Sequence, residues 1–564
     1  MNRKDIKKVL DELTGDIDSI ADKKAVTIIK VLINLVEMLA EENARLKETV
    51  QELKDEINRL KGEQGKPNIR EQKKDDDDDD DSTNPDHSSE KDRNKRLAKK
   101  ERKPKNKKTQ TVRIDRRVTV EFDKTTLPDD AEFKGYEFRI IQDLKVITDN
   151  VEFKLPVYYS ATLNKTFIAQ VPAAYKSSEF GPSLKSLVIM FYRDSGMTIP
   201  AIERFLQTFD THISRSTISR ILIDDHENFH QEKEDIFNAG MKAGDYQQVD
   251  DTGCRVNGKN YYTHVFCNPF FTAYFTRKNK DRLTLLDILC RGELKYAFNE
   301  EAYDLMLEFG LAKKWWDQIK AMFQTESLTR KDIDAILQKL FPNPKKHGTN
   351  RRIILESAAL AYYQHSEYFI QYLMSDDAPQ FNRLALHHAL CWIHEGRHYK
   401  KLNPLSELNR RILNAFLEQF WDYYDALLTY KQSPSEAMAQ KLSEQFDSLF
   451  ATTTGYDALD IRIDMTREKK KPLLLVLVHP FLPLHNNGSE LGARVQARIR
   501  DINLQTICEN GTKSKDTFAT IVQTARKMGV NIYRYIFDRV SKKYEMPSLA
   551  EMIMVAEEPI PGTT

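Results

Sequence analysis

The sequence has little cysteine and no long apolar run. Its 564 residues include five cysteines, and they are scattered without a C-x-x-C pair: Cys254, Cys267, Cys290, Cys391 and Cys508. This pattern argues against a disulfide framework or a zinc ribbon and fits a reducing cytoplasm. The chain lacks a run of about 18 apolar residues, and it is charged from Arg3 onward, so we expect neither a membrane span nor a signal peptide.

A large excess of one charge is also missing, because the formal net charge is only +1. Locally, however, the charges are segregated. Residues 75–81 are seven aspartates, whereas residues 91–108 hold eleven Lys or Arg against two acids, a local net charge of +9. We expect residues 63–108 to be a disordered linker whose basic run lies along DNA phosphates. The alternative is a solvated linker in which the acidic and basic runs pair with each other.

Leucine heptads mark the N-terminal segment. Five leucines recur every seven residues, and β-branched residues or Asn lie four positions after the first four of them: Leu32, Leu39, Leu46, Leu53 and Leu60, with Val36, Asn43, Val50 and Ile57. This a/d seam favours a parallel two-stranded coiled coil, in which Asn43 would fix the register and the dimeric state. The alternative is an amphipathic helix docked on its own domain.

Two small modules are expected next. Residues 109–178 contain short alternating runs and predict a β-rich module stabilised by packing without cysteine ligands. Residues 179–240 predict three short helices, the third starting after a capping Ser214. They match a helix-turn-helix, whose third helix would present four residues to DNA: Arg215, Ser216, Ser219 and Arg220. Three short helices are also common in α-rich proteins of other functions.

Acidic residues follow two β-favouring runs. Asp250 and Asp251 end the run from Tyr246, and Asn257-Gly258 then predicts a hairpin into further strands. Asp376 and Asp377 end a second apolar run, Phe369–Met374. An antiparallel meander with an acid at the end of its first strand is typical of ribonuclease-H-like nucleases.

A third acid, Glu490, lies in the first turn of a predicted helix. Ribonuclease-H-like folds place two strand-end carboxylates beside a helix carboxylate and hold two divalent ions about 4 Å apart, which stabilise the attacking and leaving oxygens of phosphoryl transfer. Three carboxylates suit Mg²⁺ or Mn²⁺. Glu490 also has a structural interpretation, because an acid suits a helix N-terminus and Arg494 lies at i+4.

Four stretches occur in an order that resembles the insertion sequence 66 class of transposases, members of the DDE superfamily: QVDDTGCRVNGKNYYTHVF, SDDAPQF, CWIHEGRHYKKL and HNNGSELGARVQARIRD. The resemblance covers about residues 180–290 and 370–545. It implies a leucine-zipper helix, a helix-turn-helix region and a DDE core, with Asp250, Asp376 and Glu490 as catalytic metal ligands. Its usual D-E-T and D-G motifs read Asp250-Asp251-Thr252 and Asp376-Asp377-Ala378 here, which leaves open which Asp of each pair binds metal. Since neighbours in an extended strand point to opposite faces, only one of each pair should reach the ions.

The helix after the second acid carries further candidates. Cys391 and His394 form a C-x-x-H pair that resembles a signature of several DDE transposases, although two ligands do not make a zinc site and a structural core pair is equally compatible. Positive charge continues along this helix, and we expect Arg397, Lys400 and Lys401 to face DNA phosphates.

The sequence therefore predicts a multidomain α+β DNA transposase. The expected segments are a coiled coil (1–62), the linker (63–108), the β-rich module (109–178), the helix-turn-helix region (179–240), a ribonuclease-H-like core with helical insertions at about 297–367 and 405–470 (241–508), and a C-terminal helical region (509–564). The expected partners are element ends, target DNA and a second or further copy of the chain, and the resemblance suggests accessory proteins of the same element. Two alternatives are a nuclease without strand transfer and a dimeric DNA-binding protein that has lost catalysis.

Overall fold

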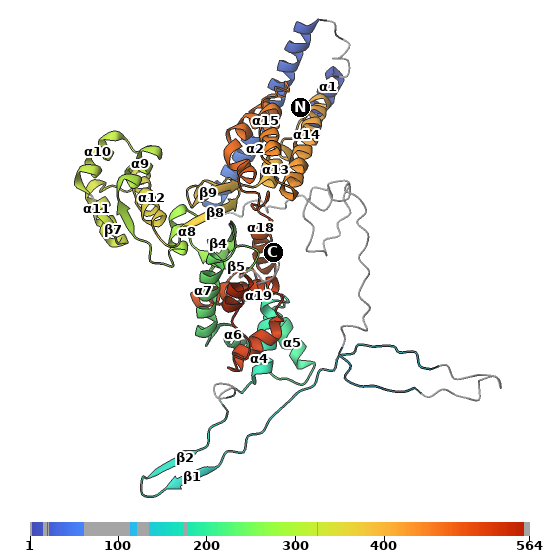
Figure 1. Ribbon diagram of the computed structural model, residues 1–564, viewed down its shortest axis with the longest axis vertical. Coiled ribbons are helices and arrows are strands. Elements are labelled where there is room, and N and C mark those ends of the chain that lie inside the picture. The colour runs from blue at the N-terminus through green and yellow to red at the C-terminus, as the bar shows by residue number, and fades with distance from the viewer. Residues whose placement is uncertain are drawn as a thin grey trace, which may run out of the picture. The chain divides into compact units, whose positions relative to one another are not determined.

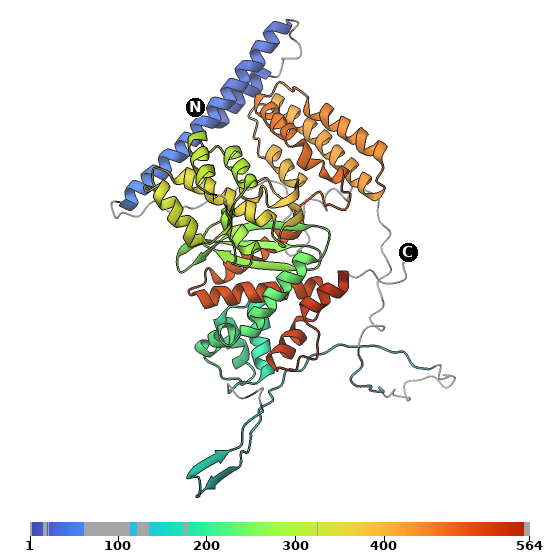
Figure 2. The same ribbon diagram turned by 60° about the vertical axis from the view of Figure 1, so that its left-hand side comes forward.

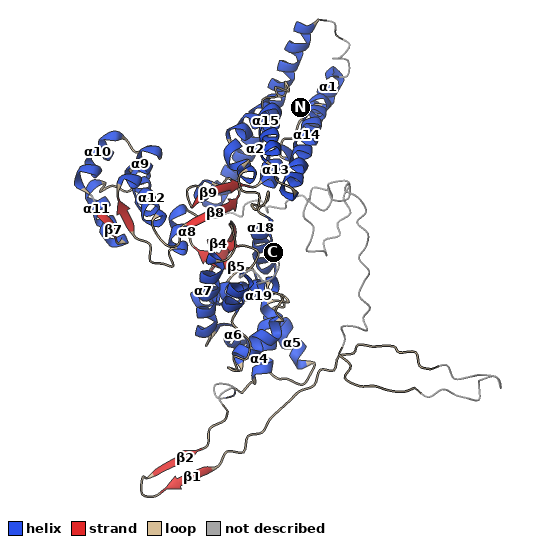
Figure 3. Cartoon of the chain, viewed as in Figure 1, coloured by secondary structure: helices blue, strands red, loops and turns tan. Residues whose placement is uncertain are grey.

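The computed structural model describes residues 3–14, 20, 22–60, 113–120, 135–172, 175, 179–323 and 325–557 (Figure 1). The linker predicted at 63–108, with its acidic and basic runs, lies outside the described residues. The chain divides into two compact units, the larger formed by Met1–Ile69, Leu155–Arg204 and Ile213–Thr564, the smaller by Arg70–Lys154 and Phe205–His212. Helices and strands are both present, which agrees with the predicted multidomain α+β class, and helices predominate (Figure 3).

A five-stranded mixed sheet forms the centre of the larger unit. Its strands are β3 (Gln247–Val256), β4 (Lys259–Cys267), β5 (Thr272–Arg277), β8 (Ile370–Ser375) and β9 (Ala385–Leu390), in the order β5-β4-β3-β8-β9. The first three strands form an antiparallel meander, and β8 and β9 run parallel to β3. The predicted hairpin is confirmed, because Asn257 and Gly258 have φ of 47° and 74°, as a two-residue turn of the favoured kind requires.

The sheet edge at β5 is covered by helix α19 (Glu509–Lys527). Side chains one turn apart on this helix accept hydrogen bonds from β5 backbone amides, Thr524 from Thr272 at 3.2 Å and Thr520 from Tyr274 at 3.1 Å. Asp516 continues the series by accepting from the amide of Thr276 at 2.5 Å. The edge is therefore closed to further strand pairing. Figure 2 shows this packing, with the red C-terminal helices against the green strands.

Two groups of mainly helical elements precede β8 and follow β9 in the chain. The first, between β5 and β8, comprises α8 (Arg282–Leu289), β6 (Tyr296–Phe298), α9 (Glu300–Glu308), α10 (Lys313–Met322), β7 (Thr325–Leu328), α11 (Arg330–Leu340) and α12 (Gly348–Gln364). The second, after β9, comprises α13 (Trp392–Lys400), α14 (Glu407–Gln432), α15 (Glu436–Phe450), α16 (Asp457–Glu468), α17 (Lys470–Leu473) and the 3-10 turn η6 (Leu475–Leu477). Buried aromatic residues of the second insertion, including Trp392, Phe420 and Phe446, form one core with Met374 of β8.

The N-terminal helix α2 (Lys23–Leu60) follows α1 (Arg3–Thr14) and has two different faces. One face docks on the second insertion, where Glu37 accepts from the amides of Leu405 and Ser406 and Ile33 is buried. The predicted seam lies on another face and is exposed: Leu32, Val36, Leu39, Leu46, Val50, Leu53 and Ile57. The docked face supports the interpretation as a helix packed on its own domain, and the exposed face is compatible with a coiled coil. Dimerisation through the seam, whose last leucine is Leu60, stays a prediction.

The three helices of residues 179–240 are present. They are α4 (Pro182–Arg193), α5 (Ile199–Gln207) and α6 (Arg215–Ile223), followed by α7 (Glu227–Lys242). As predicted, the Ser214 side chain caps α6 by accepting from the amide of Thr217 at 3.2 Å. The C-terminal region adds α18 (Asn487–Asn503) before α19, then α20 (Ile532–Val540) and α21 (Leu549–Glu557).

The strands predicted for the β-rich module are largely wrong. In the described part of residues 109–178, the strands are β1 (Val157–Ser160) and β2 (Lys165–Ile168), a single hairpin. Residues 113–120 and 135–156 contain neither helix nor strand. Their apolar side chains do not reach a core, as Val120, Phe138 and Ile141 are each more than 80% exposed. Alternating apolar residues form strands only when a packing partner buries one face, and a lone hairpin is marginal.

Candidate active site

Asp250 lies in the central strand β3. The strand was expected to end at this acid, but it continues to Val256 because residues 248–256 pair with β4, with Asp250 opposite Val265. The parallel pairing with β8, in contrast, stops at Gln248 opposite Met374. Asp250 therefore sits where β3 and β8 separate, and such divergence leaves room for a ligand beside the strand.

Asp376 directly follows β8. Asp250 and Asp376 each lie two residues beyond the last residues that pair, Gln248 and Met374, and they are near enough for the charge of Asp376 to raise the pKa of Asp250. A hydrogen bond from the amide of Ala378 to Asp376 Oδ1, 3.1 Å long, turns the chain away from the strand at this acid. The two predicted strand acids, Asp250 and Asp376, are thus neighbours where the inner strands β3 and β8 separate.

Glu490 reaches the same region from the first turn of α18. The segment before this helix is fixed on β3, since Asn486 Nδ2 donates to the carbonyl of Val249 at 3.0 Å and Gln248 Nε2 donates to the carbonyl of His485 at 3.0 Å. The helix then lies close to the sheet at Gly488 and Gly492, where an added Cβ would meet Gln248 Oε1 at 2.2 Å and Val265 at 2.8 Å. These contacts, which the sequence analysis missed, bring Glu490 to the strand acids; the G-x-x-x-G spacing was the available signal.

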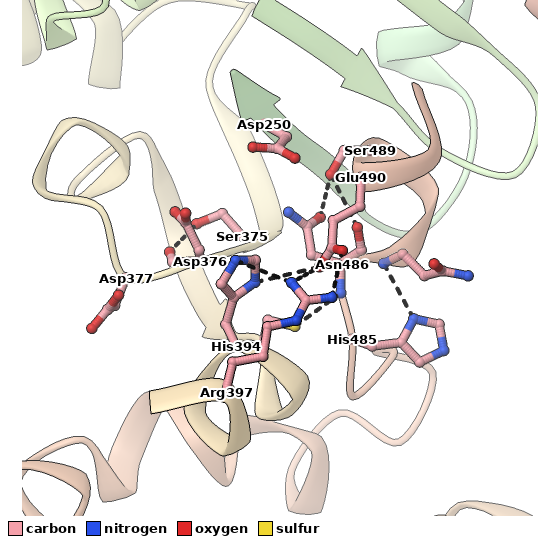
Figure 4. A network of polar contacts seen from close by, with 12 residues as sticks. Asp250, Ser375, Asp376, Asp377, His394, Arg397, His485, Asn486, Ser489 and Glu490 are labelled. Carbon is pink, nitrogen blue, oxygen red and sulfur yellow. Dashed lines mark hydrogen bonds and ion pairs between the residues drawn. The ribbon is translucent and has the colours of Figure 1, made fainter. Parts of the chain in front are cut away.

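The carboxylate of Glu490 points toward helix α13. Arg397 Nη1 and Nη2 donate to its two oxygens at 3.0 and 2.8 Å, and His394 Nδ1 lies 3.4 Å from Oε1 (Figure 4). Among the described residues, the one set of three metal-ligating side chains with all ligand atoms within 4.8 Å is Cys391, His394 and Glu490. The acids Asp250, Asp376 and Glu490 share the region but do not form such a set in this conformation.

The pKa values of the two strand acids, Asp250 and Asp376, are raised. Burial raises the pKa of Asp250 to about 7, and the negative charges of Asp376, Asp251 and Glu490 add to the shift. Burial also raises the pKa of Asp376, with a further contribution from neighbouring carboxylates and an opposing one from His394. Crowded, desolvated carboxylates of this kind mark candidate functional sites, because a cation would relieve their repulsion.

The neighbouring acids have partners of their own. Gln380 Nε2 donates to Asp251 Oδ2 at 2.9 Å, and Lys280 Nζ lies 3.8 Å from Asp251 Oδ1. Asp377 forms an ion pair with Lys469, which also contacts the buried Glu395 at 3.1 Å. Lys469 and Glu395 were missed by the sequence analysis, and no local pattern marks them.

The residues predicted to contact DNA differ in their exposure and in their partners within the chain. Arg397 is engaged with Glu490 and not free for a phosphate, whereas Lys400 and Lys401 at the end of α13 are exposed. On α6, Ser216 and Arg220 are exposed and Ser219 is half-buried. Arg215 is exposed but pairs with Glu203 at 2.6 Å.

Part of the chain matches a known protein family. Residues 357–514 match the model of the transposase IS66 family, a segment that holds Asp376, Glu490 and the second insertion. The match confirms the predicted resemblance to insertion sequence 66-type transposases. Asp250 lies outside the matched segment, so its place in the site depends on the sheet geometry.

A particular relative extends the similarity. The chain is 28% identical over 318 residues to the uncharacterized protein y4jO of Sinorhizobium fredii, and the alignment covers 54% of this chain and 94% of y4jO. The transposase family supports a transposase-related function. In the described part of the chain, no helix has both the length and the apolar character needed to cross a membrane.

Proposed function

We propose that this chain is a DNA transposase that cleaves the ends of an insertion sequence and joins them to target DNA. The observation that carries the proposal is the position of Asp250 and Asp376 where β3 and β8 diverge, with Glu490 near enough for its charge to raise the pKa of Asp250. The family match over 357–514 supports the same conclusion. The meander β3-β4-β5, with an acid on its first strand, supports a ribonuclease-H-like core.

The donor set fits Mg²⁺ or Mn²⁺. All three candidate ligands offer carboxylate oxygens, which hard divalent cations prefer, and the raised pKa of Asp250 is what a cluster of carboxylates without its cation should display. Asp250, Asp376 and Glu490 would hold two ions. When bound, the ions stabilise charge on the attacking and leaving oxygens of phosphoryl transfer.

The chain's own residues have defined tasks in this proposal. Asp250 must lose its proton before it binds a cation, and Glu490 must turn from Arg397 toward the strand acids. Arg397, once released, is within reach of a phosphate on the same side of α13, which agrees with its predicted role in DNA contact. Rotation of Glu490 would therefore replace its ion pair with Arg397 by two other contacts, one between Glu490 and the cations and one between Arg397 and a DNA phosphate.

DNA binding in this proposal uses surfaces away from the acids. Ser214 caps α6, so that Arg215 and Ser216 lie in its first turn, where a recognition helix contacts bases, and Ser219 and Arg220 lie one turn further along. Lys400 and Lys401 offer exposed charge to the phosphate backbone. The exposed seam of α2 would pair two copies, as paired element ends require, with Asn43 fixing the register.

The test is a strand-transfer assay with paired element-end DNA, taken from the sequence that flanks the gene. With Mg²⁺ or Mn²⁺ the full chain should nick one strand at each end and join the freed 3′-hydroxyl to a target plasmid. Cleavage without a joined product would identify a nuclease. End binding without any metal-dependent cleavage would leave a DNA-binding protein and overturn the catalytic proposal.

A further inference from the structure

A second set of metal ligands lies beside the three acids. Cys391 is 2% exposed and occupies the N-cap position of α13 without a side-chain capping bond, and His394 follows one turn later on the same helix. Glu490 reaches them from α18, and the ligand atoms of the three side chains all lie within 4.8 Å of one another. Figure 4 shows Glu490 beside His394 and Arg397. This set differs from the acid set in chemistry, because it offers one sulfur, one nitrogen and one oxygen.

We propose that Cys391, His394 and Glu490 bind a zinc ion, and that this ion keeps Glu490 away from Asp250 and Asp376. Thiolate and imidazole ligands select zinc over magnesium, and three protein ligands with one open position are a common zinc arrangement. The proposal goes beyond the strand-transfer function, although its inhibitory part rests on that function. It concerns a different ion, a different ligand set and a resting state of the protein.

The spacing of the atoms suits a tetrahedral ion. Ligand atoms around tetrahedral zinc lie about 3.5 Å apart, given bond lengths of about 2.0–2.3 Å. His394 Nδ1 and Glu490 Oε1 are 3.4 Å apart. His394 Nδ1 is also buried without a hydrogen-bond partner, which is costly for a polar atom unless a ligand satisfies it.

The surroundings already hold the ligands in place. The amide of Asn486 donates to Cys391 Sγ at 3.3 Å, and this contact ties the thiol to the loop that starts α18. Arg397 Nη1 and Nη2 donate to Glu490 Oε1 and Oε2 at 3.0 and 2.8 Å. Because a carboxylate oxygen has two lone pairs, Oε1 can also bind the ion, and the bonds from Arg397 then provide the outer hydrogen bonds that metal-bound carboxylates usually have. The contact between Arg397 Nη1 and His394 Nε2 is 3.5 Å long. Because arginine can only donate, this contact is given up when the ring proton moves to Nε2 and Nδ1 binds the metal.

The charges balance when zinc binds. The Cys391 thiol loses its proton to solvent as the Zn–S bond forms, so binding releases one proton. A thiolate, a carboxylate and a neutral imidazole then offset the two positive charges of the ion. A neutral site is the arrangement that a buried position favours.

Direct zinc binding is the first measurement. The full chain, freed of metal, is titrated with ZnCl₂ against a chromophoric chelator, and we expect one tight site per chain. Cys391→Ser and His394→Ala should each weaken that site at least a hundredfold, whereas Asp250→Asn should change it less than threefold. Matched controls at exposed positions, Cys508→Ser and His365→Ala, should bind zinc as the wild type does.

Cobalt provides a readout that does not depend on the variants folding. Co²⁺ at the site should give the near-ultraviolet charge-transfer band of a thiolate ligand in the wild-type protein. Absence of this band together with absence of tight zinc binding overturns the proposal. Equal loss of zinc in Asp250→Asn and Cys391→Ser also overturns it, because the ion would then belong to the acid set.

Inhibition is the second measurement and separates this proposal from the proposed function. Micromolar Zn²⁺ should suppress Mg²⁺-dependent cleavage at least tenfold in the wild type. The ratio of activities with and without zinc should approach one in His394→Ala. A protein that binds zinc but never cleaves DNA fails the transposase proposal alone, and one that cleaves equally with and without bound zinc fails the inhibitory part alone.

Discussion

Two pairs of consecutive aspartates lie in β3 and directly after β8. In both pairs the fold gives the first and the second aspartate different surroundings. Among the described residues, the first member of each pair, Asp250 or Asp376, forms no ion pair and has a raised pKa. The second member, Asp251 or Asp377, has a lysine partner. In the extended strand β3, adjacent side chains point to opposite faces, so Asp250 and Asp251 are separated by the strand itself. Asp376 and Asp377 follow β8, and there the turn at Asp376 separates them.

The comparison assigns different tasks to the two members. Burial raises the pKa of Asp377, but the hydrogen bond and charge of Lys469 outweigh burial and hold this pKa below its ordinary value. Asp377 is therefore a charged structural anchor. Asp250 is the opposite case: the Asp251 amide donates to its Oδ1 at 2.7 Å, but burial and the neighbouring carboxylates outweigh this hydrogen bond and keep its pKa raised. The acids that lack a cationic partner are the better candidates for metal ligands.

The largest expected effect concerns the first members. Asp250→Asn and Asp376→Asn should each lower Mg²⁺-dependent strand cleavage by about a thousandfold or more, because the loss of a metal ligand removes several kcal/mol of transition-state stabilisation. Asparagine keeps the shape of the side chain, so binding to element-end DNA should be unchanged. Cleavage and gel-shift assays on the same preparations measure both.

The matched variants are Asp251→Asn and Asp377→Asn. If either of these abolished cleavage while Asp250→Asn or Asp376→Asn remained active, the assignment within that pair would be reversed.

The next effect is the pH dependence of magnesium affinity. Protonated Asp250, with a pKa of about 7, competes with the cation, so affinity should fall about tenfold per pH unit below 7 and become flat above it. Calorimetry in buffers of different ionisation enthalpy should count up to one proton released at pH 6 and none from this group at pH 8.

The same group should affect stability without divalent ions. Its folded pKa lies above its unfolded value of about 3.9, so the folded state holds more protons between these values and stability falls as pH rises through this window. The midpoint temperature of the wild type should therefore decline relative to Asp250→Asn from pH 4 to pH 7. Parallel curves for the two proteins would contradict the raised pKa.

A smaller effect tests the anchor. Lys469→Met leaves Asp377 and the buried Glu395 without a shared cation, and we expect a loss of about 1–2 kcal/mol in free energy of unfolding, discounted because Asp377 is 37% exposed. Lys470→Met is the control, since Lys470 pairs with the 60% exposed Asp447 and its substitution should cost less than about 0.5 kcal/mol. Urea denaturation measures both, and equal losses would contradict the anchor.

Local signals in the sequence predicted much of this architecture. The leucine heptads, the Asn257-Gly258 turn and the Ser214 cap all depend on residues within a few positions, and the helix, turn and cap are present. Apolar runs that end in acids also located the strands of the site. The alternating runs around Val120 and Phe138 failed, because alternation does not reveal whether any partner exists to bury one face.

Long-range contacts could not be predicted in this way. The partner of Glu490, Arg397, lies 93 residues earlier, and the partner of Asp377, Lys469, lies 92 residues later. Such pairs depend on how the inserted helices pack against the sheet. Local patterns in a single sequence do not predict this packing. The sequence therefore identified candidate acids but not which acid of each pair was neutralised.

The smallest effect would sharpen the comparison at β3. Asp251→Asn retains a hydrogen-bond acceptor for Gln380 and removes only the charge opposite Lys280, a 3.8 Å contact with a half-exposed lysine. We expect a loss of less than about 1 kcal/mol in stability and less than about tenfold in cleavage. Because the charge of Asp251 also raises the pKa of Asp250, the variant should move the pH midpoint of magnesium binding downward. An unchanged midpoint would mean that the charge of Asp251 does not affect the pKa of Asp250. The different roles of the two carboxylates would then depend on their positions alone.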